Sequence, residues 1–150
     1  MNEEAVRNRI KILMKFKNIS QKDMARSGRK NVGTYTVKVT GIGNYSGSIS
    51  KTFKIIPKST SIKSITSDYN KITVKWKAQK KQTTKYQIEY ALNSSFKNSK
   101  KVKVALSKTS YTIKNLTPYK TYYVRIRTYK TSGSKTYYSK WSKKKSVYVW

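Results

Sequence analysis

A turn followed by a strictly alternating strand, residues 116–127, is the sequence feature that most constrains the fold. Pro118 fixes its own φ and has no N–H to donate, so a central strand cannot run through it. From residue 122 onward, side chains fall alternately on two faces. Tyr122, Val124 and Ile126 share one face, and Tyr123, Arg125 and Arg127 share the other. The pattern predicts a half-buried strand with a solvated, basic outer face.

Short alternating segments recur at regular spacing through the second half of the chain, as expected of a β-sandwich. In residues 71–77, for example, Ile72, Val74 and Trp76 point inward while lysines and Thr73 point outward. Residues 93–99 are predicted to form a loop and residues 131–135 a turn. The predicted strands are 61–67, 71–77, 85–91, 101–106, 110–114, the strand that follows Pro118, and 137–149.

Residues 32–56 are predicted to form a β-hairpin. Two alternating runs flank a loop in which Gly41, Gly43, Gly47 and Asn44 tolerate positive φ. Pro57 closes this segment, and residues 57–61 are interpreted as a linker.

Residues 1–31 do not alternate and form a leader that is either helical or disordered. Val6, Ile10 and Leu13 recur at helical spacing among basic residues, which is typical of a short basic amphipathic helix. The alternative, which we favour, is a non-native leader or the frayed remnant of a truncated domain. The segment is a poor signal peptide, because Lys15 and Lys17 interrupt its apolar run.

The segment from residue 58 to residue 150 resembles a fibronectin type III domain. Trp76, the strand from Tyr86 to Tyr90, and the Tyr138-Ser-Lys-Trp141-Ser motif match positions of that family. The Leu116, Pro118 and Tyr122 spacing resembles its tyrosine corner, in which the Tyr hydroxyl bonds to upstream backbone. The resemblance implies an all-β, seven-stranded antiparallel sandwich. It gives structural roles to Trp76, Leu116, Pro118, Tyr122 and Trp141.

The hairpin sequence resembles the last two strands of the Ig-like repeats in surface proteins of Gram-positive bacteria. Its Gly33-Thr-Tyr start, its Gly43-Asn-Tyr loop and its Phe53-x-Ile end carry this resemblance. We therefore divide the chain into a leader at 1–31, a partial Ig-like repeat at 32–56 and a fibronectin type III domain at 57–150. The two resemblances imply the C-terminal piece of a secreted or wall-associated, hence extracellular, bacterial protein.

The charge is extreme, with a net +30. Residues 57–150 hold 23 Lys and Arg against two acidic residues, so the excess belongs to the predicted domain. A polyanion partner is one interpretation, and a lysine-rich face that keeps sheet edges soluble is the other. Only 6 of the 35 basic residues are Arg, which argues against specific nucleic-acid recognition. The candidate polyanion or glycan surface comprises Tyr123, Arg125, Arg127, Tyr137, Lys140, Lys143, Lys144 and Lys145.

The residues that catalysis most often uses are missing. The chain has no His and no Cys, which removes the commonest general base, metal ligand and thiolate nucleophile. Glu89 is expected to face Arg125 or Arg127 as an exposed ion pair. No two carboxylates are predicted to converge, and no apolar run is long enough to span a bilayer. We expect no enzyme activity, cofactor or metal. The only carboxylates are Glu3, Glu4, Asp23, Asp68 and Glu89.

Three functions remain open at this point. The first is a spacer or an adhesion and display module that contacts neighbouring domains of a longer chain. The second is a module that binds cell-wall polyanions such as wall teichoic acid, anionic glycans or nucleic acid. The third is an accessory module of a secreted hydrolase. A polyanion complex should weaken steeply with salt, which separates the second function from the first.

Overall fold

The structure is a computed structural model that describes residues 31–40 and 47–150. The chain divides into two compact units, Met1–Ile55 and Ile56–Trp150. The helix considered for residues 1–31, and the loop residues Gly41, Gly43 and Asn44, lie outside the described residues. Every regular element that the described ranges contain is a β-strand.

The first unit contains the expected hairpin. Strand β1 (Gly33–Thr40) pairs antiparallel with β2 (Ser48–Ile55). On one face, the rings of Tyr35 and Phe53 lie 5.8 Å apart between centroids. On the other, the hydroxyls of Thr36 and Thr52 are 3.1 Å apart and share a hydrogen bond. Cross-strand pairs of this kind stabilise a two-stranded sheet, which is marginal alone.

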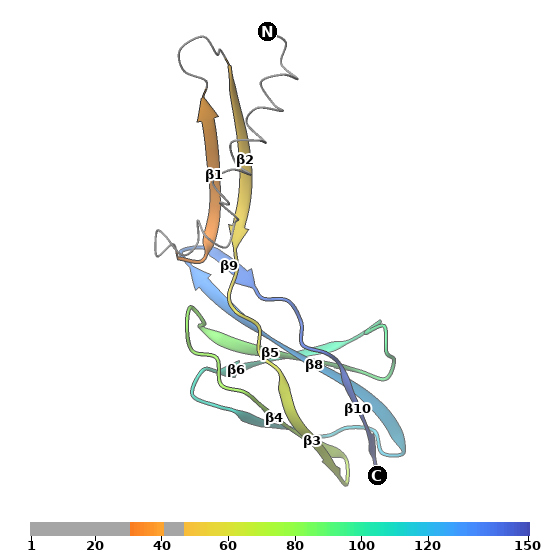
Figure 1. Ribbon diagram of the computed structural model, residues 1–150. Helices are drawn as coiled ribbons and strands as arrows, with labels where there is room; N and C mark the ends of the chain where they lie inside the picture. The colour runs from red at the N-terminus through yellow and green to blue at the C-terminus, as the bar shows by residue number, and fades with distance from the viewer. Residues whose placement is uncertain (1–30, 41–46) are drawn as a thin grey trace. The chain divides into compact units, whose positions relative to one another are not determined.

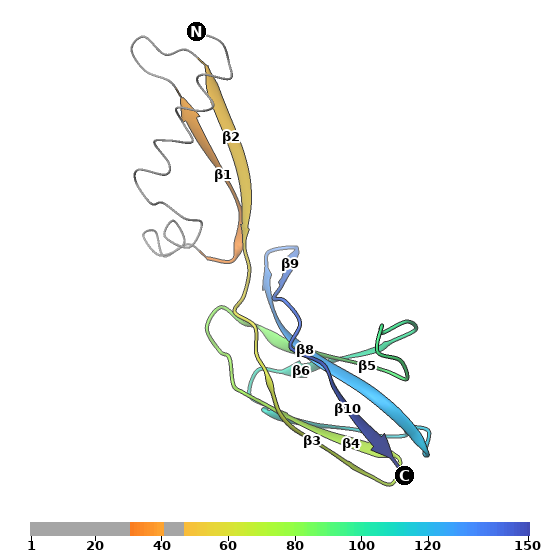
Figure 2. The same cartoon turned by 45° about the vertical axis from the view of Figure 1, so that its right-hand side comes forward.

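The second unit is a sandwich of two antiparallel sheets that face each other (Figures 1 and 2). The smaller sheet has the order β3-β4-β7, and the larger has the order β10-β8-β5-β6, with β9 also paired to β8. The strands of the smaller sheet are β3 (Ile62–Asp68), β4 (Lys71–Trp76) and β7 (Ser110–Ile113). Those of the larger are β5 (Lys85–Ala91), β6 (Lys100–Ala105), β8 (Lys120–Ser132), β9 (Lys135–Tyr138) and β10 (Lys145–Val149).

The core lies between the two sheets and uses the side chains that the alternation placed inward. Trp76 is 1% exposed, and its ring meets that of Tyr86 edge-on at 5.3 Å. The Tyr86 hydroxyl accepts a hydrogen bond of 2.8 Å from the Gln79 N–H, so this buried polar group is satisfied. The other side chains with almost no exposure are Ile72, Val74, Ile88, Val124, Ile126 and Val149.

The tyrosine corner is confirmed. Tyr122 is 6% exposed, and its hydroxyl accepts a 3.0 Å hydrogen bond from the Thr117 N–H. Leu116 is buried and Pro118 half-buried, so the turn packs onto the sandwich before β8 begins. The corner thereby fixes where β8 begins, and with it which side chains of β8 face outward.

Two predicted strands differ in detail. The strand expected at 137–149 is two strands, β9 and β10, separated by residues 139–144. The strand expected at 61–67 has a bulge between Ile62 and Ser64, which turns both Ile62 and Ile65 toward the core despite their odd spacing.

Candidate functional site

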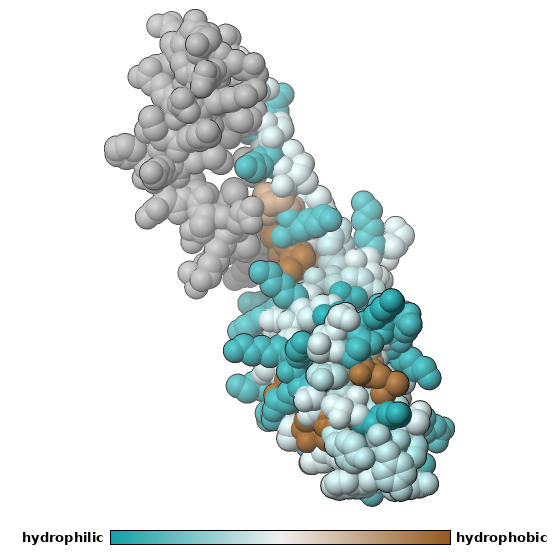
Figure 3. Space-filling view, turned by 90° about the vertical axis from the view of Figure 1, so that its right-hand side faces the viewer, coloured by the Kyte–Doolittle hydropathy of each residue, from teal (hydrophilic) through white to brown (hydrophobic). Residues whose placement is uncertain are grey.

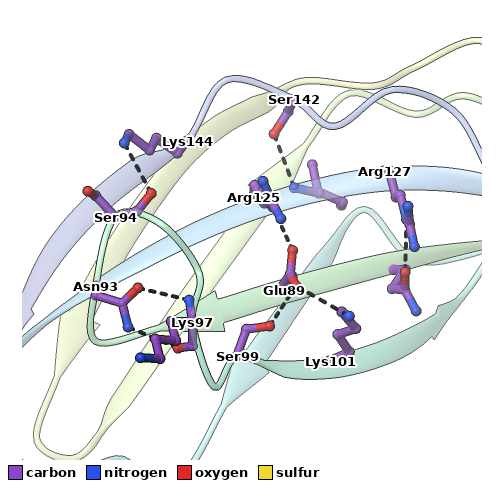
Figure 4. Close-up of polar contacts among 12 residues, drawn as sticks. Glu89, Asn93, Ser94, Lys97, Ser99, Lys101, Arg125, Arg127, Ser142 and Lys144 are labelled. Atoms are coloured by element: carbon purple, nitrogen blue, oxygen red, sulfur yellow. Dashed lines mark hydrogen bonds and ion pairs between the residues drawn. The ribbon is translucent and has the colours of Figure 1, made fainter.

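The outer face of the larger sheet brings together the basic residues of β8 and the polar residues of β5. In the register of these strands, Glu89 lies opposite Arg125 and Gln87 lies opposite Arg127. Arg125 Nε donates to Glu89 Oε2 at 2.6 Å, and Arg127 Nε donates to Gln87 Oε1 at 2.9 Å. Figure 4 shows both contacts crossing from one strand to the next. Each arginine thus has a partner on its own sheet.

Glu89 is a buried, fully partnered carboxylate. The prediction that it faces Arg125 is confirmed, but the expected exposure is wrong, because the residue is only 3% exposed. Ser99 Oγ donates to Glu89 Oε1 at 2.6 Å, and Lys101 Nζ lies 3.5 Å from the same oxygen. Burial raises the pKa of Glu89. The hydrogen bonds from Ser99 and Arg125, and the charges of Arg125 and Lys101, lower it further than burial raises it, so the carboxyl is ionised at neutral pH.

Two serines explain why the last strand is interrupted. Ser139 donates its N–H to the Thr128 carbonyl at 3.0 Å, while its Oγ accepts the Thr128 N–H at 3.1 Å. Ser142 does the same for Ile126, at 2.8 Å and 3.1 Å. The side chains therefore replace ladder partners of β8, which satisfies its backbone while residues 139–144 leave the regular strand path.

This detour places Trp141 between the two arginines. Arg125 Cζ lies 4.0 Å from the centroid of the Phe96 ring and 4.6 Å from that of Trp141. Arg127 Cζ lies 4.1 Å from the Trp141 centroid and 3.8 Å from that of Tyr138. Three aromatic rings and two guanidinium groups therefore alternate, with Trp141 in the middle. Each such contact stabilises by about 0.5–2 kcal/mol, more where water is excluded. We call these five side chains the arginine stack: Phe96, Arg125, Trp141, Arg127 and Tyr138.

The arginine stack joins strands that are far apart in sequence. Phe96 comes from the β5–β6 loop, the arginines from β8, Trp141 from the break between β9 and β10, and Tyr138 from β9. Burial lowers the pKa of Arg127, although a guanidinium stays protonated at neutral pH. Because rings cover the faces of both guanidinium groups, and Glu89 and Gln87 take their Nε–H groups, the stack braces the outer face.

Tyr123 and Lys144 form a smaller contact beside the arginine stack. Lys144 Nζ lies 5.9 Å from the centroid of the Tyr123 ring. The same ammonium donates to the Ser94 carbonyl at 3.2 Å, a contact visible in Figure 4. Lys144 is exposed and its side chain reaches back to the β5–β6 loop, so this part of the predicted surface has access to solvent.

Tyr137 and Lys145 do not share that face. Tyr137 pairs with Lys130 and Lys145 with Val124, both of which have the inward parity of β8. Lys145 Nζ donates to the Lys63 carbonyl of β3 at 3.0 Å, across the edge of the sandwich.

Lys140 and Lys143 are exposed, and neither ammonium group has a partner among the residues that the structure describes. Figure 3 shows a surface that is mostly teal or white, with small, separate hydrophobic areas. The candidate residues therefore do not form one continuous face, because Tyr137 and Lys145 have the opposite parity to Tyr123, Arg125 and Arg127.

Four residues that contact the two arginines are not part of the surface predicted from the sequence: Gln87, Phe96, Tyr138 and Trp141. The sequence places Phe96 only in a loop and gives Trp141 only a structural role. Strand register could have found Gln87 and Tyr138, since they lie opposite Arg127 and Tyr129. Phe96 has a left-handed backbone, with φ 59°, in a loop whose path period-two patterning does not predict.

The two acidic side chains among residues 31–40 and 47–150, Asp68 and Glu89, belong to different sheets. Asp68 closes β3 in the smaller sheet and pairs with Lys71 at 2.9 Å, whereas Glu89 belongs to the larger sheet. Within the same ranges, no group of three or more His, Cys, Asp or Glu residues could hold a metal ion. No helix in the described part of the chain has the length and apolarity needed to cross a membrane.

The sequence model of the family described as fibronectin type III domain matches residues 56–145. No curated protein sequence matches the chain. At 17–19% identity, likeness to solved structures shows the fold alone.

Three solved structures illustrate that likeness. The fn3 domain of human contactin 1 is 19% identical with a TM-score of 0.53, covering 61% of this chain and 76% of that chain. The FN1-FN3 domains of chicken CNTN1 are 19% identical with a TM-score of 0.52, covering 78% of this chain and 41% of that chain. The fn3 domain of human collagen alpha-1(XX) is 17% identical with a TM-score of 0.51, covering 62% and 85%. This chain thus spans under half of the CNTN1 chain.

Proposed function

Since the chain belongs to the fibronectin type III family, through its residues 56–145, we propose that it is a non-catalytic extracellular module of a bacterial surface or secreted protein. Its role is that of a spacer or of an adhesion and display module. Domains of this family are generally structural. The Ig-like resemblance of residues 32–56 and the bacterial context stay predictions from the sequence.

The arginine stack is the observation that supports the spacer role. The two arginines were the residues best suited to bidentate anion recognition. Each instead donates its Nε–H to a residue of β5, and each lies between two aromatic rings. Both guanidinium groups are held by contacts within the domain, which favours a rigid domain over ligand binding. A spacer needs such rigidity.

Attraction to polyanions is the second candidate. After Glu89 and Asp68 have paired with neighbouring cations, most lysines of residues 57–150 still lack a carboxylate partner. The run from Lys143 to Lys145 is the densest part of this excess, and all three side chains are exposed. A net charge of this size attracts anionic glycans or nucleic acid without a shaped site.

A heparin column separates the two roles. The full chain is loaded in low salt and eluted with a gradient through about 0.5 M NaCl. One variant carries alanine at Lys143, Lys144 and Lys145. The matched control carries alanine at three exposed lysines elsewhere, Lys75, Lys81 and Lys108.

If the protein is a spacer whose charge acts diffusely, both triple variants should elute at the same salt concentration, slightly below that of the parent. Elution of the Lys143–Lys145 variant at much lower salt than the control would instead indicate a localised polyanion site. That result would replace the spacer role by the second candidate.

A further inference from the structure

A cavity of about 320 Å³ lies at the end of the sandwich where the β5–β6 and β7–β8 loops meet. Asn98 and Asn115 have φ of 53° and 56°, in the left-handed region that Asn tolerates, and this turns each loop at the cavity rim. The volume suits a ligand of one or two sugar rings. Its lining includes Tyr90, Leu92, Asn98, Lys100, Lys114 and Asn115.

The Tyr122 hydroxyl and the Thr117 N–H of the cavity lining bond to each other, but other polar side chains of the lining have no partner in the described part of the protein. The Tyr90 hydroxyl, the ammonium groups of Lys100 and Lys114 and the amides of Asn98 and Asn115 make no hydrogen bond or ion pair there. Burial raises the pKa of Tyr90, so its hydroxyl keeps its proton and can donate at neutral pH. In the arginine stack, by contrast, both guanidinium groups have partners within the domain.

The charge of the cavity is uncompensated. Its lining includes two lysines and no carboxylate. The two carboxylates of the described residues are bound elsewhere, Asp68 by Lys71 and Glu89 by Arg125 and Lys101. Two ammonium groups at one concave site attract an anion more strongly than the same charges on a flat surface.

Exposed aromatic rings gather at the same end of the unit. The Asn70 N–H donates to the Trp150 carbonyl at 2.7 Å, and the Tyr119 N–H donates to the Val149 carbonyl at 2.7 Å, which ties three segments together. The rings of Tyr148 and Trp150 lie 6.3 Å apart. This end carries five of the six exposed large hydrophobic side chains of the described residues: Tyr69, Leu92, Tyr119, Tyr148 and Trp150.

Four of these five side chains are Tyr or Trp, each with a flat apolar face and a polar tip. Such a surface suits a ligand that has both apolar ring faces and hydroxyl groups. It is less suited to an aliphatic surface of a partner protein. A concentration of exposed rings at one end of a small domain also marks an interaction site.

We propose that this cavity binds a uronic acid unit of an acidic glycan. The carboxylate lies between the ammonium groups of Lys100 and Lys114, and the sugar hydroxyls bond to Tyr90 and to the two Asn amides. The sugar ring packs on Leu92, and neighbouring units of the glycan extend over the exposed rings. The proposal rests on the extracellular role proposed above.

Calorimetric titration of the full chain with tri-galacturonic acid tests the proposal, with galactotriose as the neutral probe, in about 0.15 M salt. The key variant is Lys100→Ala with Lys114→Ala. Its control, Lys81→Ala with Lys135→Ala, loses the same charge at two exposed positions at the opposite end of the sandwich. Tyr90→Phe removes only the hydroxyl. Tryptophan fluorescence melts establish that each variant is folded.

We expect saturable binding of the acidic probe, at least about tenfold weaker in the Lys100/Lys114 variant and within about twofold of the parent in the control. Tyr90→Phe should weaken binding severalfold. Equal losses in the two double variants, equal affinity for the neutral probe, or no saturable binding would overturn the cavity site. Each of these results would leave the spacer role intact, because that role is tested by the heparin elution of the Lys143–Lys145 variant.

Discussion

The ion pair between Glu89 and Arg125 should contribute more to stability than a surface pair does. The Glu89 side chain is 4% exposed and the Arg125 side chain 28%, and the contact between them is 2.6 Å. Glu89→Gln removes the charge but keeps the side-chain size. It leaves Arg125 held between Phe96 and Trp141 without its counter-ion. Breaking a largely buried, hydrogen-bonded charge pair of this kind costs about 2–3 kcal/mol.

The assay is equilibrium unfolding followed by tryptophan fluorescence. All three tryptophans lie in the second unit, at positions 76, 141 and 150, so the signal reports that unit alone. At about 4–8 °C per kcal/mol for a domain of this size, the melting temperature of Glu89→Gln should fall by about 10–20 °C. The control is Asp68→Asn, whose pair with Lys71 is exposed, and its melting temperature should match the parent's.

A double-mutant cycle with Arg125→Met isolates the pair from other effects of each substitution. We expect a coupling free energy of about 1.5–3 kcal/mol, the range for hydrogen bonds to charged groups. A coupling below about 0.5 kcal/mol is the value for exposed pairs, and it would refute the view that burial strengthens this contact.

Two further predictions concern the same unit. Tyr122→Phe should lower its unfolding free energy by about 1 kcal/mol, since the hydroxyl bond to the Thr117 N–H is lost while the ring stays packed; an unchanged urea midpoint would contradict the corner. The pKa of Glu89 is lowered in the folded state. The ionised carboxylate therefore adds to the free energy of unfolding above its pKa in the unfolded chain, about 4.3, and this stabilisation is lost as pH falls through the folded pKa. The parent should therefore lose more stability than Glu89→Gln between about pH 5 and pH 2.5 in fluorescence-detected unfolding, and parallel curves would count against this.

The sequence predicted the strands because most of them bury one face. Ile72, Val74 and Trp76 alternate with exposed or half-exposed residues, and a period of two leaves only one way to place them inward. The corner at Tyr122 was predictable for a similar reason, since Pro118 excludes a strand and the hydroxyl needs a partner. Residues with a strong backbone or burial constraint can be placed from sequence.

The arginine stack was less predictable because its geometry depends on a break in pairing. Alternation alone extends one strand from residue 137 to residue 149, and nothing in that pattern indicates that serine hydroxyls take over ladder bonds at residues 139 and 142. Period-two reasoning also labels Glu89 as outward and therefore exposed. Outward residues become buried when neighbouring long side chains fold over them, as Arg125 does here.

The positions of the first and last strands have a mechanical consequence. Thr128 Oγ1 donates to the Lys58 carbonyl near one end of β8, while Val149 pairs with Lys120 at the other end, so the second unit is entered and left at opposite ends (Figure 1). Tension along the chain would slide β3 along β4 and β10 along β8 in shear, rather than peel them apart one bond at a time. Several backbone bonds must then break together. The lifetime of the unit under load is set by that barrier to forced unfolding and not by its equilibrium stability.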